Sequence, residues 1–66
     1  MNKFMVNVKL KLNREYKFIF GLFDSCYGIV LSQNENWIKI RYCHNVFYDG
    51  KVVNINLFRV NAFREV

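Results

Sequence analysis

"DGKVVNINLFRVNAF", residues 49 to 63, is the stretch of sequence that decides the fold. Its apolar residues alternate with polar ones up to Leu57, and at Phe58 the alternation shifts by one position. A shift of one residue moves every later side chain to the opposite face of a sheet. The shift therefore predicts either a β-bulge within one long strand or a strand end followed by a tight turn.

We favour the turn over the bulge. Leu57, Val60 and Phe63 have the spacing of one helical turn that enters a strand, and short 3₁₀ turns are frequent connectors. We expect a 3₁₀ turn near Leu57-Arg59 and a closing strand over residues 60–66. Before this strand pair, Asp49 and Gly50 predict a two-residue hairpin turn, because both residues can adopt positive φ.

The rest of the chain also has the pattern of short strands separated by turn residues. We expect strands over residues 4–12, 16–23, 27–32 and 37–43, with a polar turn at 33–36. Gly21 and Gly28 are expected at bulges or sharp bends. Strand residues alternate between faces. Within 37–43 this alternation directs Ile38, Ile40 and Tyr42 inward, and Trp37, Lys39, Arg41 and Cys43 outward.

Helices longer than one turn are not expected, because apolar 3.6-residue spacing and good helix formers are nearly absent. Five or six strands predict one all-β domain over residues 1–66, a small antiparallel barrel of SH3-like type, with an OB-like barrel as the alternative. The run from Gly28 to Ile40 is loosely similar to the central hairpin of Sm-like and other SH3-like barrels. The Sm RNA-binding signature has no match elsewhere, so this resemblance assigns no functional residue.

Size and charge limit the classes of function. A chain of 66 residues buries only about 60% of the surface that its unfolded form exposes, yet 53% of its residues are hydrophobic and 18% aromatic. We expect some large side chains near the surface, where a partner or a second copy of the chain would cover them. The net charge of +5 favours nucleic acid or an acidic protein surface as that partner.

The sequence favours a soluble, cytoplasmic protein with no membrane association. Asn7, Lys9 and Lys11 interrupt the apolar residues near the N-terminus, which is not the pattern of a signal peptide. No apolar run approaches the roughly 20 residues of a membrane-spanning helix. Cys26 and Cys43 are expected to be reduced, and whether they approach each other stays open.

Catalytic and metal-binding patterns are weak. A nucleophilic cysteine needs a base beside it, and His44 is the single histidine. Strand neighbours face opposite ways, so we expect Cys43 and His44 to diverge, leaving Cys26 as the other partner for His44. Two separated cysteines and one histidine lack the close ligand pairs of zinc motifs, and the glycines are too scattered for a phosphate loop. We expect no enzyme, no cofactor and no metal.

A basic surface with an aromatic residue in it is the strongest candidate site. Cations bind phosphates, and exposed bases stack on aromatic rings with about 1 to 3 kcal/mol per base. We predict a non-catalytic protein that binds nucleic acid or a nucleoprotein complex. The predicted binding residues come from the first strand and the outward face of 37–43: Lys9, Lys11, Trp37, Lys39 and Arg41.

Two other interpretations use the same residues. Residue types with A/T-rich codons dominate the chain, a composition associated with phages and mobile elements. The alternative function is a small phage or mobile-element inhibitor, such as an anti-CRISPR or anti-restriction protein, that blocks a host or defence protein. Interfaces are enriched in Trp, Tyr, Phe and Arg, and the chain would supply these from Trp37, Tyr42, Tyr48, Phe47, Arg41 and Arg59. In the ordinary structural interpretation, the lysines and arginines only solvate the surface.

Overall fold

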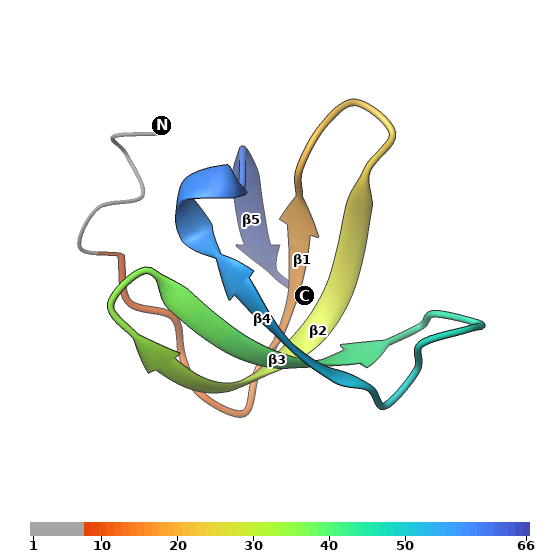
Figure 1. Ribbon diagram of the computed structural model, residues 1–66, viewed down its shortest axis with the longest axis horizontal. Coiled ribbons are helices and arrows are strands. Elements are labelled where there is room, and N and C mark those ends of the chain that lie inside the picture. The colour runs from red at the N-terminus through yellow and green to blue at the C-terminus, as the bar shows by residue number, and fades with distance from the viewer. Residues whose placement is uncertain (1–7) are drawn as a thin grey trace.

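The structure is a computed structural model that describes residues 8–66 of the chain, and it is all-β (Figure 1). The five strands form one antiparallel sheet in the order β4-β3-β2-β1-β5, so the last strand returns to pair with the first. The elements in chain order are β1 (Glu15–Ile19), β2 (Ser25–Asn34), β3 (Trp37–Cys43), β4 (Val52–Asn56), the 3₁₀ turn η2 (Leu57–Arg59) and β5 (Ala62–Glu65).

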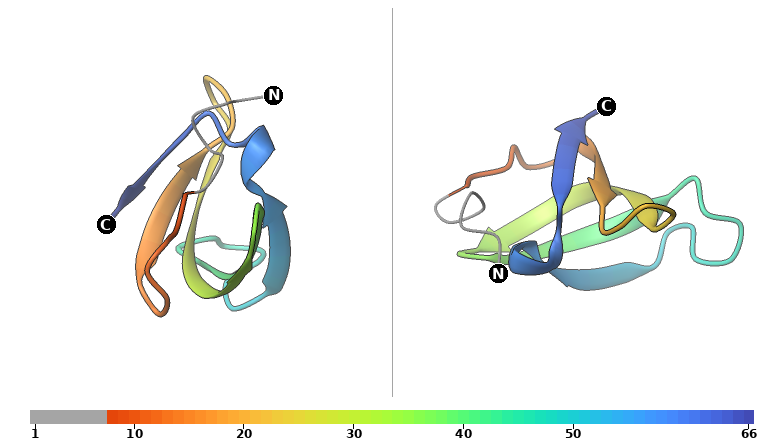
Figure 2. Two further views of the ribbon diagram at one scale, coloured as in Figure 1. Left: turned by 90° about the vertical axis from the view of Figure 1, so that its left-hand side faces the viewer. Right: turned by 90° about the horizontal axis from the view of Figure 1, so that it is seen from above.

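The sheet curls, and both views of Figure 2 show that it does not lie flat. In the described part of the chain no strand pairing joins the two edge strands, β4 and β5. The prediction of an all-β antiparallel fold with one 3₁₀ turn is therefore confirmed, whereas closure into a barrel is not established by hydrogen bonds.

Tight packing at Gly28 and a bulge accompany the curl in β2. The register between β2 and β3 shifts between Val30 and Ser32, and a bulge of this kind increases local twist. A Cβ atom on Gly28 would lie 2.5 Å from Cδ1 of Ile40. A larger residue at position 28 would therefore displace the Ile40 side chain, whose Cβ and Cγ1 would also lie only 3.1 and 3.2 Å from the added atom.

The predicted alternation of β3 is confirmed. Ile38 and Ile40 are fully buried, while Trp37, Lys39 and Arg41 are exposed on the other face. The inward side chains of the sheet join residues from the turn and from the N-terminal segment to form the core: Leu10, Tyr16, Phe18, Val30, Ile38, Ile40, Ile55, Leu57 and Val60.

The predicted 3₁₀ turn at Leu57–Arg59 is confirmed and explains the shift in the sequence pattern. The Asn56 side chain accepts a hydrogen bond from the Phe58 N–H (3.0 Å), and the Val60 N–H donates to the Leu57 carbonyl (3.0 Å). Leu57 and Val60 are both fully buried, because one helical turn brings residues three apart to the same side. The closing strand then begins at Ala62.

The predicted first strand is wrong over the residues that can be compared. Residues 4–7 lie outside the described residues, and 8–12 form no strand. Instead, the Leu10 N–H donates to Gln33 Oε1 (2.9 Å), and Gln33 Nε2 donates to the Val8 carbonyl (2.6 Å). Both edges of the next strand, β1, are already paired with β2 and β5. The alternating segment therefore has no edge of β1 to join.

Three other expected elements differ in length. The strand expected over 27–32 runs over Ser25–Asn34 as β2, so the polar turn expected at 33–36 is confined to residues 35 and 36. The strand expected over 16–23 ends at Ile19, and Gly21 lies in the following bend. The hairpin at Asp49-Gly50 exists as the β3–β4 pair, but its connection runs over residues 44–51. Gly50 alone of the Asp49-Gly50 pair has positive φ (83°). Its N–H donates to the Tyr42 carbonyl (2.7 Å). The hydrogen bonds between the two arms of the hairpin therefore end at Gly50, and Asp49-Gly50 does not form the predicted two-residue turn.

Within residues 8–66, no helix is long and apolar enough to cross a membrane.

Candidate nucleic-acid interface

β3 aligns three of the predicted binding residues on its outward face. Trp37, Lys39 and Arg41 occupy alternate positions, and half of the Trp37 surface is exposed (50%). Residues two apart in a strand are separated by about 7 Å. The face thus presents a ring and two cations in a regular row, supported from behind by the buried Ile38 and Ile40.

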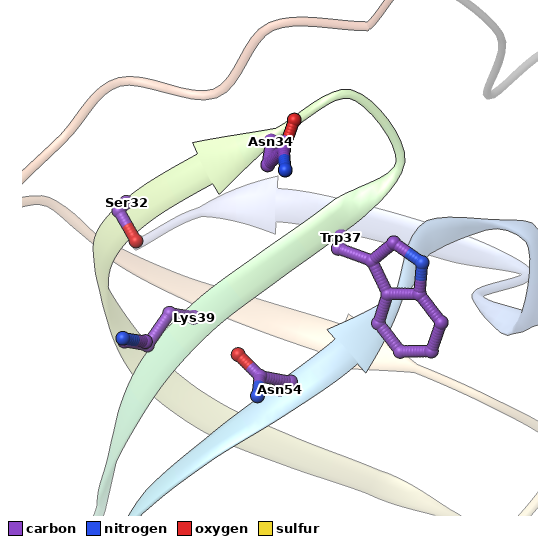
Figure 3. A pocket seen from close by; sticks show the side chains of 5 residues that line it. All are labelled: Ser32, Asn34, Trp37, Lys39 and Asn54. Carbon is purple, nitrogen blue, oxygen red and sulfur yellow. The ribbon is translucent and has the colours of Figure 1, made fainter.

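Trp37 and Lys39 also line an open groove of about 490 Å³ with polar residues from the two neighbouring strands (Figure 3). Asn34 of β2 lies opposite Trp37, and Ser32 of β2 and Asn54 of β4 flank Lys39. Figure 3 shows the Lys39 and Asn54 side chains next to each other and the indole over the end of β4. The groove therefore combines a flat ring, a cation and neutral hydrogen-bonding groups.

Sequence reasoning missed the three polar residues of this groove. Asn34 was placed in a turn and Ser32 at a strand end, because the length of β2 and its bulge were not foreseen. The signal that was available is the short β2–β3 connection: a turn at residues 35 and 36 puts Asn34 opposite Trp37. Cross-strand neighbours on one face lie close enough for their side chains to interact.

The electrostatics of the groove favour an anion. Within residues 8–66, ion pairs join Lys11 and Arg14 to Glu65, and His44 lies against Glu15. Lys39 and Arg41 take part in none of them, and no acidic residue lines the groove. Their charges are therefore available to an incoming phosphate.

The other two predicted residues, Lys9 and Lys11, do not share a strand face, because their segment is not a strand. Both are exposed, and Lys11 Nζ lies 3.6 Å from Glu65 Oε1 of β5. Neither residue lines the groove beside Trp37. The structure thus brings Trp37, Lys39 and Arg41 together and leaves the two lysines elsewhere.

The expected divergence of Cys43 and His44 is wrong. Alternation of faces holds only while the backbone stays extended, and His44 has left the strand with a φ of 60°. Its side chain turns back over the sheet, where its Nε2 lies 3.1 Å from Glu15 Oε2. Donor atoms of Glu15, Cys43 and His44 all lie within 4.8 Å of one another.

Cys26 and Cys43 form no disulfide. Burial, with smaller effects of the Asp24 and Cys43 charges, raises the pKa of Cys26 to about 11. Burial also raises the pKa of Cys43, helped by the nearby carboxylates of Glu15 and Asp49. Because the thiolate is the reactive form, neither cysteine is poised as a nucleophile.

Comparisons of the chain with protein-family models, with curated proteins and with solved structures found no match. The class that the fold defines is a small all-β protein built on a curled, five-stranded antiparallel sheet. Its function has to be argued from the groove and the charges around it.

Proposed function

We propose that this protein binds single-stranded nucleic acid, free or within a nucleoprotein complex, on the outward face of β3. The observation that carries the proposal is the half-exposed Trp37 in line with two cations, Lys39 and Arg41, that have no ion-pair partner within residues 8–66. In this arrangement the indole stacks on a base, and the two cations bind phosphates of the same strand.

A single strand fits this face better than a duplex. Bases in a duplex are stacked on one another and offer no free face to an indole, whereas unpaired bases are recognised by stacking on aromatic side chains. Asn34 and Asn54 in the groove carry both donors and acceptors for a base edge. Contacts of this kind add a modest base preference to an affinity that comes mainly from charge and stacking.

The same proposal assigns the fold to the SH3-like small barrels. Three features support this assignment: the last strand pairs with the first, a 3₁₀ turn directly precedes the last strand, and the sheet curls. Small β-barrels of related architecture bind oligonucleotides on an exposed strand face, which is where the Trp37 groove lies.

The test uses the fact that Trp37 is the only tryptophan. Its fluorescence is followed while single-stranded RNA, single-stranded DNA and duplexes of equal length are added at several salt concentrations. We expect saturable quenching by single strands, with log affinity falling linearly with log salt at a slope of about 0.7 per phosphate contact. Absence of binding at low salt, or binding without any change in fluorescence, would overturn the proposal.

A pair of arginine variants makes the test specific to β3. Arg41→Ala removes a cation beside the groove, and we expect the salt slope to fall by about 0.7. Arg64→Ala removes the same charge from β5, which is separated from β3 by β1 and β2 in the sheet. If both variants change the slope equally, net charge and not the β3 face determines binding.

A second candidate function, inhibition of a host or defence protein by direct contact, is favoured by two exposed apolar loops. Phe23 is 97% exposed in the β1–β2 connection, and Phe47 is 88% exposed in the β3–β4 connection. Both connections leave the sheet at the same end, because they join successive antiparallel strands in the same direction. Aromatic side chains at such positions are typical anchors of protein interfaces.

Capture from nuclease-treated host lysate separates the two functions. A protein partner that is retained by Trp37→Ala and lost by the double variant Phe23→Ser/Phe47→Ser supports inhibition through the loops. Loss of every partner after nuclease treatment supports nucleic-acid binding. Self-association of the purified chain that the double variant abolishes would identify a second copy as the occupant of the loops.

A further inference from the structure

Three potential metal ligands, Glu15 and the consecutive pair Cys43 and His44, meet on the outer face of the sheet. Glu15 begins β1, Cys43 ends β3, and His44 follows it. Each offers one donor atom, a carboxylate oxygen, a thiol sulfur and an imidazole nitrogen, and these atoms all lie within 4.8 Å of one another. The sequence pattern gives no sign of this cluster, because Glu15 lies on β1, which is not adjacent to β3 in the sheet.

The sheet register fixes where Glu15 and Cys43 lie. Glu15 is opposite Ile29, and Cys43 is opposite Tyr27, so the two residues flank β2 on one face. Only β2 separates them, so their backbones are about 10 Å apart, and the Glu15 side chain reaches across β2 toward Cys43. Their relative position is thus set by the backbone hydrogen bonds of three strands.

His44 is held over the same face by contacts on several sides. Its backbone N–H donates to Asp49 Oδ1 (3.0 Å), which stabilises the left-handed conformation of this residue. Its ring stands edge-on to Tyr27, with ring centroids 5.6 Å apart and an interplanar angle of 85°. Its Nε2 lies 3.1 Å from Glu15 Oε2. The imidazole is therefore oriented before any ligand arrives.

We propose that Glu15, Cys43 and His44 bind a zinc ion, with the fourth position open to water or to an exogenous ligand. Thiolate, imidazole and carboxylate are the three ligand types that zinc uses in proteins, and three protein ligands with one open position are typical of zinc centres that bind a further ligand. Magnesium and calcium prefer oxygen ligands alone. The thiolate and the carboxylate together neutralise the charge of the ion.

The distances suit a tetrahedral ion after small side-chain rotations. Zinc bonds of 2.0 to 2.3 Å place the ligand atoms of a tetrahedron about 3.3 to 3.7 Å apart. The separation of His44 Nε2 and Glu15 Oε2 is already close to this range, and no pair exceeds 4.8 Å. The His44 side chain is 64% exposed, so an ion can enter from solvent.

Metal titration of the reduced, untagged full chain tests the proposal. We expect cobalt(II) to bind one to one with a visible spectrum that contains a thiolate charge-transfer band, and we expect zinc to displace it. Calorimetry gives the zinc affinity directly. The absence of one-to-one binding in both measurements would overturn the proposal.

Four near-isosteric variants identify the ligands. Glu15→Gln, Cys43→Ser and His44→Asn should each lower the zinc affinity at least about tenfold, since even residues that only orient a ligand contribute this much. Asparagine tolerates the left-handed backbone of position 44, so the third variant keeps the loop. Cys26→Ser is the matched control and should leave the affinity unchanged.

Two results would contradict the assignment even if zinc binds. An equal loss in Cys26→Ser and Cys43→Ser would indicate a different site built from both thiols. A cobalt spectrum that Cys43→Ser leaves unchanged would indicate a site without the thiolate. Circular dichroism of each variant without metal verifies that lost affinity does not come from unfolding. None of these measurements depends on nucleic-acid binding.

Discussion

The seven residues of β3 alternate between two faces, and these faces differ in almost every physical property. The inner face carries Ile38 and Ile40, both fully buried in a core to which residues 8–66 contribute no buried charged or polar residue. The outer face carries Trp37, Lys39 and Arg41, exposed to solvent. The comparison shows that in a small sheet one face of a strand can stabilise the fold while the other stays exposed to solvent.

The largest expected effect comes from the inner face. Ile40→Ala should lower the free energy of unfolding by about 2 to 5 kcal/mol, because it removes buried methyl groups and leaves a cavity. A single core in a chain of this size supplies only about 3 to 5 kcal/mol of net stability, so much of the variant should be unfolded. Urea unfolding followed by circular dichroism measures the change.

Its neighbour on the outer face provides the control for this experiment. Lys39→Ala alters an exposed side chain and should change the free energy of unfolding by less than about 0.5 kcal/mol. If the two variants were equally stable, the division of β3 into a structural face and a solvent-exposed face would be wrong.

The second prediction concerns the close contact between Gly28 of β2 and Ile40 on the inner face of β3. Gly28→Ala should destabilise the protein by about 1 to 3 kcal/mol, because the added Cβ would lie 2.5 Å from Ile40 Cδ1. Ile40→Val removes that methyl group. In the double variant we therefore expect less destabilisation than the sum of the two single changes.

A double-mutant cycle measured by urea unfolding gives this coupling directly. Additive effects would mean that the cost of alanine at position 28 comes from the backbone and not from Ile40. In that outcome the tight packing between β2 and β3 would not be what requires glycine.

The third prediction concerns the outer face. Trp37→Ala should weaken single-strand binding by about 1 to 3 kcal/mol, because a stacked base is lost. Anisotropy of a labelled oligonucleotide measures the affinity, and circular dichroism confirms folding. Tyr48→Ala is the control, since Tyr48 is also half exposed but lies in the β3–β4 loop. Equal losses from both variants would show that exposed aromatic residues bind without regard to position.

Much of the fold could be predicted because its signals are local. The alternation over residues 37–43 and the shift at Leu57-Phe58 each reflect which side of the chain must be buried, and the structure places β3 and η2 there. Residues 8–12 alternate in the same way but form no strand. Both edges of β1, the strand that follows this segment, are paired with β2 and β5, and this pairing is a property of the whole sheet that the local pattern does not contain.

The candidate sites were predictable to a smaller extent for the same reason. Trp37, Lys39 and Arg41 lie two apart, so their common face follows from strand geometry alone. The positions of Ser32 and Asn34 beside them depend on the bulge in β2. The meeting of His44 with Glu15 depends on a left-handed residue at the end of β3 and on the register of β1.

The smallest expected effect concerns Cys26, which lies on the inner side of β2 and packs against the core. The pKa of Cys26 is raised from 9.0 to about 11, first by burial. A raised thiol pKa favours folding below pH 9, where the thiol is protonated in both states. Between pH 9 and 11 the unfolded chain loses this proton and the folded protein keeps it, so stability should fall as pH rises.

Unfolding free energies of the wild-type protein and Cys26→Ser across this pH range isolate the contribution of Cys26. The wild-type protein should lose more stability than the serine variant, by a small amount because the group is only half buried. Alkylation of the folded protein at pH 9 gives a second measure, in which Cys26 should react far more slowly than in the urea-unfolded chain. Equal rates in both states would mean that the interior of the sheet does not shield this thiol, and the contrast between the two faces would then not extend to β2.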